Sequence, residues 1–106
     1  MVTNLYHLGN KGYYLNFLNN SMVNKWYILG TVQASEYRTK VLISLREKPK
    51  TPAILEKEIK IKMSHVSRTL NELLKLGLIK CLNPSLRKGK LFYITKEGIK
   101  VHKYLK

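Results

Sequence analysis

The residues best suited to chemistry lie on one face of a short helix, which the spacing of apolar residues predicts at about residues 63–76. The expected buried face carries Met63, Val66, Leu70, Leu73 and Leu74. The opposite face carries Ser64, Arg68, Asn71, Glu72 and Lys75. Serine, arginine and asparagine side chains hydrogen-bond well to base edges and phosphates, so this face suits contact with nucleic acid. The alternative is a solvated face on an ordinary amphipathic helix.

A compact group of cations follows between two strand-like runs at residues 78–82 and 91–94. Asn-Pro and Lys-Gly dipeptides in residues 83–90 mark the bends of a hairpin, whose tip displays Arg87, Lys88 and Lys90. Such a cluster can grip phosphates or enter a minor groove. The alternative is a solvated hairpin whose charges deter aggregation at a sheet edge.

Capping residues indicate the elements that position these two features. Ser35 is the expected N-cap of a helix that ends before Pro49. Thr51 followed by Pro52 marks the start of a second, shorter helix. A brief turn then leads into the helix at residues 63–76, which Gly77 is placed to end. A short helix, a turn and a longer helix in this order form a helix-turn-helix unit.

Two further segments flank this unit. Residues 23–30 are apolar and aromatic, and they are expected to form a strand or an interface element. Thr95 is expected to cap a closing helix. Gly98 lies in its first turn and is expected to weaken that helix.

The net charge restricts the class of partner. Twenty Lys and Arg stand against six acidic residues, which gives +14 at pH 7. All of these cations except Lys11 are spread from Lys25 to Lys106, so they belong to a folded surface and not to a basic tail. This excess favours nucleic acid as the partner, and a solvated lysine-rich surface is the alternative.

Several classes of site are not expected. Cys81 is the only cysteine, and it is expected to be a packed core residue. A single cysteine fits a protein in a reducing, cytoplasmic setting. The three histidines, at positions 7, 65 and 102, lack neighbouring ligands at metal-binding spacing, and no metal site or cofactor is predicted. The sequence contains no paired carboxylates, no nucleophile-base motif and no phosphate-binding loop, so an enzyme is not expected. Neither a targeting signal nor a membrane span is expected.

Residues 1–21 are expected to be an N-terminal extension, disordered or translated upstream of a start at Met22. A mobile arm that contacts DNA or a partner is the alternative. The folded domain is predicted to span residues 22–106. Its expected fold class is mainly α with a small β-hairpin wing.

Residues 22–106 resemble winged helix-turn-helix transcriptional regulators related to the ArsR and MarR families, and archaeal single-domain members in particular. The resemblance rests on motifs at the first helix, the helix-turn-helix and the hairpin. They are Ser35-x-Tyr37-Arg38-x-x-Val41-Leu42-x-x-Leu45, Thr51-Pro52, Ser64-His65-Val66-Ser67-Arg68-x-Leu70-x-x-Leu73, Lys75-x-Gly77-Leu78-Ile79, Lys88-Gly89-Lys90 and Thr95-x-x-Gly98. The paired-cysteine motif of metal-responsive ArsR proteins is absent, and no effector pocket can be assigned.

The resemblance implies a sequence-specific regulator that binds double-stranded DNA. The start of the recognition helix would enter the major groove with Ser64, His65, Ser67, Arg68 and Asn71. Phosphate contacts would come from Thr51 and the wing cations Arg87, Lys88 and Lys90, and Lys75 is a further DNA-binding candidate. Glu72 on the same face would repel phosphate, and it is expected to pair with Arg68 or Lys75.

A homodimer is also predicted, because a domain of this size buries little apolar surface alone. Residues 26–29 and the closing helix are candidate interface elements, although Trp26 and Leu29 could instead complete the monomer core. Two other function classes remain open. One is a protein-binding winged helix of the transcription apparatus, and the other is a non-specific architectural or RNA-binding protein.

Overall fold

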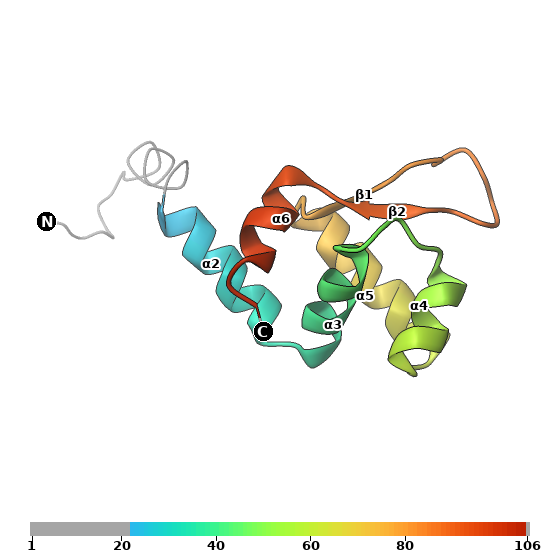
Figure 1. The fold of residues 1–106 in the computed structure, drawn as a ribbon, viewed down its shortest axis with the longest axis horizontal. Coiled ribbons are helices and arrows are strands. Elements are labelled where there is room, and N and C mark those ends of the chain that lie inside the picture. The colour runs from blue at the N-terminus through green and yellow to red at the C-terminus, as the bar shows by residue number, and fades with distance from the viewer. Residues whose placement is uncertain (1–21, 106) are drawn as a thin grey trace, which may run out of the picture.

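The computed structural model describes residues 22–105, in which five helices surround a two-stranded hairpin (Figure 1). The expected extension at residues 1–21 lies outside the described part of the chain. The elements are α2 (Met22–Gln33), α3 (Glu36–Leu45), α4 (Pro52–Ile59), α5 (Met63–Lys75), β1 (Ile79–Cys81), β2 (Phe92–Ile94) and α6 (Lys96–His102). The predicted class, mainly α with a small hairpin, is confirmed. None of the described helices is long and apolar enough to cross a membrane.

Side-chain caps begin three of the helices where the sequence predicts them. The hydroxyl oxygen of Ser35 accepts from the N–H of Arg38, and that of Thr51 accepts from the N–H of Ile54. Thr95 caps α6 in the same way. Each cap satisfies a backbone donor that the first turn of a helix leaves without a partner.

Gly77 ends α5 as predicted. Its φ of 77° lies in the left-handed region, which favours glycine. There the N–H groups of Gly77 and Leu78 donate to the carbonyl oxygens of Leu74 and Leu73. This turn directs the chain from α5 straight into β1.

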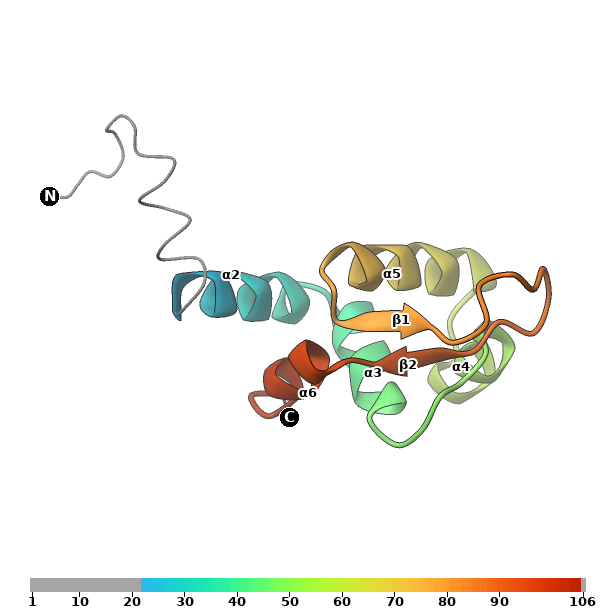
Figure 2. The same cartoon turned by 90° about the horizontal axis from the view of Figure 1, so that it is seen from above.

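The core lies between α3, α5 and the hairpin, with α2, α4 and α6 closing its sides (Figures 1 and 2). β1 and β2 pair antiparallel, with Ile79 opposite Ile94 and Cys81 opposite Phe92. The buried apolar residues come from every helix and both strands: Leu29, Val32, Val41, Leu42, Leu45, Leu55, Val66, Leu70, Leu73, Leu78, Ile79, Phe92 and Val101.

Residues 23–30 belong to the helix α2, so the prediction of a strand there is wrong. A short apolar run does not distinguish a strand from a buried helix by its pattern alone. The helical spacing of Leu29 and Val32 places both side chains in the core, and Ile28 packs against it. α2 therefore contributes to the domain core, whereas Trp26 and Tyr27 remain exposed.

Gly98 allows α6 to pack closely against the hairpin, and its expected weakening of the helix stays a prediction. A Cβ at this position would overlap the carbonyl oxygen of Leu78 and the side chain of Ile94. The same region is held by the N–H of Thr95, which donates to Leu78 O at 2.9 Å, and by its hydroxyl, which donates to Gly77 O at 2.8 Å. The helix can approach the hairpin this closely because residue 98 has no side chain.

Candidate nucleic-acid interface

The outward face of α5 carries the polar residues that the sequence places there. Ser64, Ser67, Arg68, Asn71 and Lys75 are all exposed. Val66, Thr69, Leu70 and Leu73 point into the core and fix the rotation of the helix. Most of the predicted recognition face is thus presented to solvent on a well-anchored helix.

Met63 does not belong to the buried face, because 36% of it is exposed. It is the first residue of α5, and the buried positions of this helix begin one turn later at Val66. Thr69 takes a place in the core that the apolar pattern did not assign, with 3% of its surface exposed. The buried stripe is therefore shifted slightly from the predicted one.

Arg68 is held by a neighbour on the same helix. Its Nη2 lies 2.8 Å from Nδ1 of His65, one turn earlier. The imidazole is half-buried, and its centroid lies 5.1 Å from that of the Tyr37 ring on α3. His65 therefore lies between the exposed guanidinium of Arg68 and the helix α3.

Glu72 pairs with neither Arg68 nor Lys75, so that expectation is wrong. Its Oε1 accepts from Nη1 of Arg38 at 2.9 Å, and Nε of Arg38 donates to the carbonyl oxygen of Thr31 at 3.0 Å. Arg38 comes from α3, where only 19% of its side chain is exposed. The pairing neutralises the carboxylate that would otherwise repel phosphate, and it ties α2, α3 and α5 together.

The wing is organised around Asn83. Its Oδ1 accepts from the N–H of Leu91 at 2.8 Å, and its Nδ2 donates to Gly89 O at 3.3 Å. Arg87 and Lys88 are exposed on this loop, and Lys90 is half-buried. Asn83 thus closes the base of the loop and leaves its cations at the tip.

The wing loop and the beginning of α5 lie at the same end of the molecule as α4, whereas α2 and α6 lie at the other end (Figure 2). Thr51 begins α4 at this end. The structure therefore brings the start of α4, the start of α5 and the wing loop to one end of the domain, whereas Lys75, the last residue of α5, lies toward the other end.

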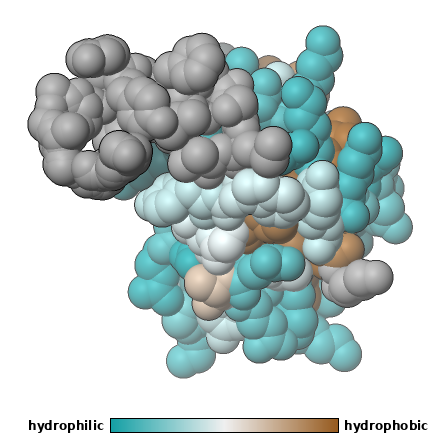
Figure 3. Space-filling view, turned by 90° about the vertical axis from the view of Figure 1, so that its left-hand side faces the viewer, coloured by the Kyte–Doolittle hydropathy of each residue, from teal (hydrophilic) through white to brown (hydrophobic). Residues whose placement is uncertain are grey.

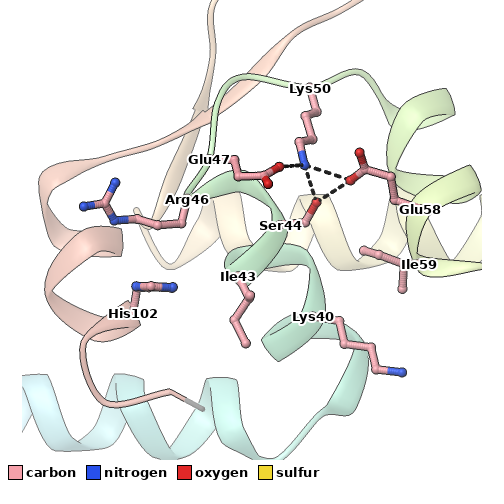
Figure 4. Close-up of a pocket in the computed structure, with 9 residues that line it drawn as sticks. All are labelled: Lys40, Ile43, Ser44, Arg46, Glu47, Lys50, Glu58, Ile59 and His102. Carbon is pink, nitrogen blue, oxygen red and sulfur yellow. Dashed lines mark hydrogen bonds and ion pairs between the residues drawn. The ribbon is translucent and has the colours of Figure 1, made fainter.

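Lys50 is a buried charged residue that no pattern in the sequence indicated. Only 1% of it is exposed, and its backbone forms an antiparallel bridge with Phe92, with N···O distances of 3.0 and 2.9 Å. Its Nζ lies 2.8 Å from Oε1 of Glu47, 2.8 Å from Oε1 of Glu58 and 2.9 Å from Oγ of Ser44 (Figure 4). Lys50 therefore joins the end of α3, the helix α4 and the strand β2.

The charges of this cluster stabilise one another. Burial lowers the pKa of Lys50, but the hydrogen bonds to Glu47 and Glu58 outweigh it, and the net pKa is raised. The hydrogen bonds from Lys50 and Ser44 lower the pKa of the Glu58 carboxyl. Both shifts favour the charged forms, so the cluster is an ion pair network near neutral pH.

A hollow of about 630 Å³ adjoins the network between α3, α4 and α6 (Figure 4). Its lining mixes cations such as Lys40 and Arg46 with Glu47 and Glu58, and His102 lies at one side.

Within residues 22–105, no group of three or more His, Cys, Asp or Glu side chains is placed to hold a metal ion. Cys81 is partly buried against the core.

The helix pair α4 and α5, followed by the hairpin and α6, defines a winged helix-turn-helix domain. No protein-family model and no curated protein matches the chain. Solved structures of transcriptional regulators do match it.

The transcriptional repressor BigR from Xylella fastidiosa matches with a TM-score of 0.65 at 20% identity, over 76% of this chain and 83% of that one. The reduced form of MarR from E. coli matches with a TM-score of 0.61 at 23% identity, over 92% and 74%. A mutant MarR complexed with operator DNA matches with a TM-score of 0.59 at 23% identity, over 95% and 75%. At these identities the likeness shows a shared MarR-like winged-helix fold.

Proposed function

We propose that this protein is a sequence-specific transcriptional regulator that binds double-stranded DNA. In this proposal α5 enters the major groove, and residues 83–90 contact the DNA backbone or the minor groove. The observation that carries it is the exposed polar face of α5, with Arg68 near its centre, at the same end of the domain as the wing cations. A MarR structure with a similar fold is complexed with operator DNA, which supports double-stranded DNA as the ligand.

The side chains divide into two roles. Base contacts are assigned to Ser64, His65, Ser67, Arg68 and Asn71, the polar residues nearest the start of α5 and its exposed face. Backbone contacts are assigned to Thr51, Lys75, Arg87, Lys88 and Lys90. The Thr51 oxygen already accepts the helix-capping bond, so its hydroxyl proton is left to donate to a phosphate.

The distribution of charge supports DNA as the partner. The chain carries +14, and four of its six glutamates form ion pairs within the described residues. Glu72 is the one carboxylate within α5, and Arg38 neutralises it. In the described structure the cations of α5 and the wing therefore form no ion pair with an acidic side chain.

We further propose a homodimer built through the α2 and α6 end of residues 22–106. Trp26, Tyr27 and Tyr104 are exposed there by 48%, 69% and 41%, and the Trp26 and Tyr104 rings meet edge to face at 5.3 Å. Figure 3 looks onto this end, where pale and brown side chains lie among hydrophilic ones. Covering these rings would place two copies of α5 about 34 Å apart on DNA. Sedimentation of the full chain with Trp26→Ala and Tyr27→Ala tests this assembly.

A cytoplasmic location and a kinship with ArsR-related and archaeal single-domain regulators complete the proposal. They rest on the lone Cys81 and on the sequence motifs of the helix-turn-helix.

The test is selection of the full chain on a randomised duplex library, followed by affinity measurements on the best duplex and on a scrambled duplex of equal composition. Near physiological salt, we expect a preference above about a thousandfold. Arg68→Ala should cost about 1–3 kcal/mol on the preferred duplex and much less on the scrambled one. Tight binding without preference would point to an architectural protein, and no binding to either duplex would point to a protein partner.

A further inference from the structure

His65 differs from the other predicted base-contacting residues of α5. Ser64, Ser67, Arg68 and Asn71 are exposed, whereas the His65 ring is half-buried against Tyr37 of α3. The two ring planes are inclined at 47°, with centroids 5.1 Å apart. The contact with Tyr37 on α3 therefore fixes the side chain of His65 in the DNA-free protein.

The hydrogen bond between His65 and Arg68 has only one possible direction. A guanidinium carries donors and no acceptor, so Nδ1 of His65 must accept from Nη2 of Arg68 across their 2.8 Å contact. An imidazole that accepts at Nδ1 is neutral and carries its proton on Nε2. The tautomer of His65 follows from the identity of its partner.

This contact leaves the recognition edge of Arg68 available. Nη2 has two hydrogens, and the bond to His65 uses one of them. Whichever of the two bonds to His65, the other Nη2 hydrogen is parallel to a hydrogen on Nη1 or on Nε, and such a pair can form the two parallel bonds by which arginine reads guanine. A free arginine samples many rotamers, and part of this side-chain entropy is lost whenever the guanidinium is fixed on a base. Ordering it beforehand reduces that loss on binding.

We infer that His65 is a positioning residue: it connects Tyr37 to Arg68 and holds the guanidinium ready for a base edge, and it does not itself read a base. This inference rests on the proposed function, and it replaces the base contact assigned there to His65 by a role in holding Arg68. Because the saving concerns one ordered side chain, the expected effect is about three- to tenfold in affinity for the preferred duplex. Binding to a scrambled duplex, which needs no fixed guanidinium, should change little.

The experiment is a double-mutant cycle on the full chain with His65→Ala, Arg68→Ala and the double variant. His65→Ala alone should weaken binding to the preferred duplex three- to tenfold, and it should have no further effect once Arg68 is absent. His65→Asn is the matched control, because its Oδ1 can accept a hydrogen bond from a position close to that of Nδ1. It should retain most of the affinity.

Equal losses from His65→Ala with and without Arg68 would overturn the inference, since they would mean that His65 contacts DNA independently. The contact is also tested without DNA by nitrogen NMR of the imidazole in the free protein. Protonation on Nε2 is expected, and a proton on Nδ1 would overturn the inference even if no preferred duplex exists. Equal binding of the unmodified chain to all duplexes would instead refute the proposed function.

Discussion

Removing the ammonium of Lys50 is expected to be far less damaging than removing its two carboxylate partners. The side chain of Lys50 is 1% exposed, whereas those of Glu47 and Glu58 are exposed by 74% and 44%. In Lys50→Met the aliphatic stem is retained, and both carboxylates can be hydrated where they stand. In the double variant Glu47→Gln with Glu58→Gln, the ammonium stays buried and has only neutral oxygens around it.

The magnitudes follow from this asymmetry. Stranding a buried charge by removing its partner typically costs about 3–5 kcal/mol. We expect about 3 kcal/mol for the stranded ammonium of Lys50, because the glutamine carbonyls and Ser44 Oγ can still accept from it. Replacing a buried ion by an apolar group of similar shape is often close to neutral. Lys50→Met should therefore stay within about 1 kcal/mol of the unmodified protein.

Urea denaturation of the full chain at pH 7, followed by circular dichroism, measures both changes in the free energy of unfolding. Glu36→Gln is the control, because its pair with Lys40 is exposed at both ends, by 72% and 50%. It should change stability by less than about 0.5 kcal/mol. A larger loss for Lys50→Met than for the double glutamine variant would refute the reasoning. Such a result would mean that the ion pairs between Lys50 and the two glutamates give a net stabilisation of the domain. The carboxylates would then do more than compensate for the burial of the ammonium.

Three further predictions concern pH, salt and packing. The folded-state pKa of Glu58 is lowered, so its contribution to stability is present above the ordinary value of 4.5 and is lost as the pH falls through the folded value. Thermal melts from pH 7 to pH 2.5 should show Glu58→Gln losing less stability on acidification than the unmodified protein, and parallel curves would contradict this. Neutralising Arg87 and Lys88 should weaken binding to every duplex alike and reduce the slope of log affinity against log salt by up to about two units; an unchanged slope would remove the wing from the interface. Gly98→Ala should destabilise the domain by about 1–3 kcal/mol, because its Cβ overlaps the hairpin. Gly30→Ala in open space should stabilise α2 slightly in the same melts, and equal effects of the two substitutions would argue against a packing role for residue 98.

Local signals in the sequence were sufficient for most of the fold. Caps at Ser35, Thr51 and Thr95 depend on a side chain and a backbone N–H three residues later, so they can be read along the chain. The same holds for Gly77 at the end of α5. The strand predicted at residues 23–30 was wrong because a short apolar run is compatible with either structure until its packing partner is known.

The candidate site divides in the same way. The exposed polar face of α5 follows from helical periodicity, and its contact with DNA stays a prediction. Glu72 was expected to pair within three or four residues, but its partner Arg38 lies 34 positions away on α3. The burial of Lys50 could not be predicted, because Glu58 approaches it only when α4 packs against the end of α3. Pairings of this kind depend on tertiary structure and leave no periodic trace.

These two unpredicted pairings have a common consequence for the proposed interface. Arg38 binds Glu72, and Lys50 binds Glu47 and Glu58, so these two cations, of which Lys50 is fully buried, are matched with acidic side chains. The cations left without such partners in the described structure include Arg87 and Lys88 on the exposed wing. A protein with excess positive charge repels itself least when that charge is at the surface and a polyanion can approach it. The internal pairing therefore does more than stabilise the fold, because it uses acidic side chains inside the domain and leaves Arg87 and Lys88 without acidic partners on the wing, where DNA is proposed to bind.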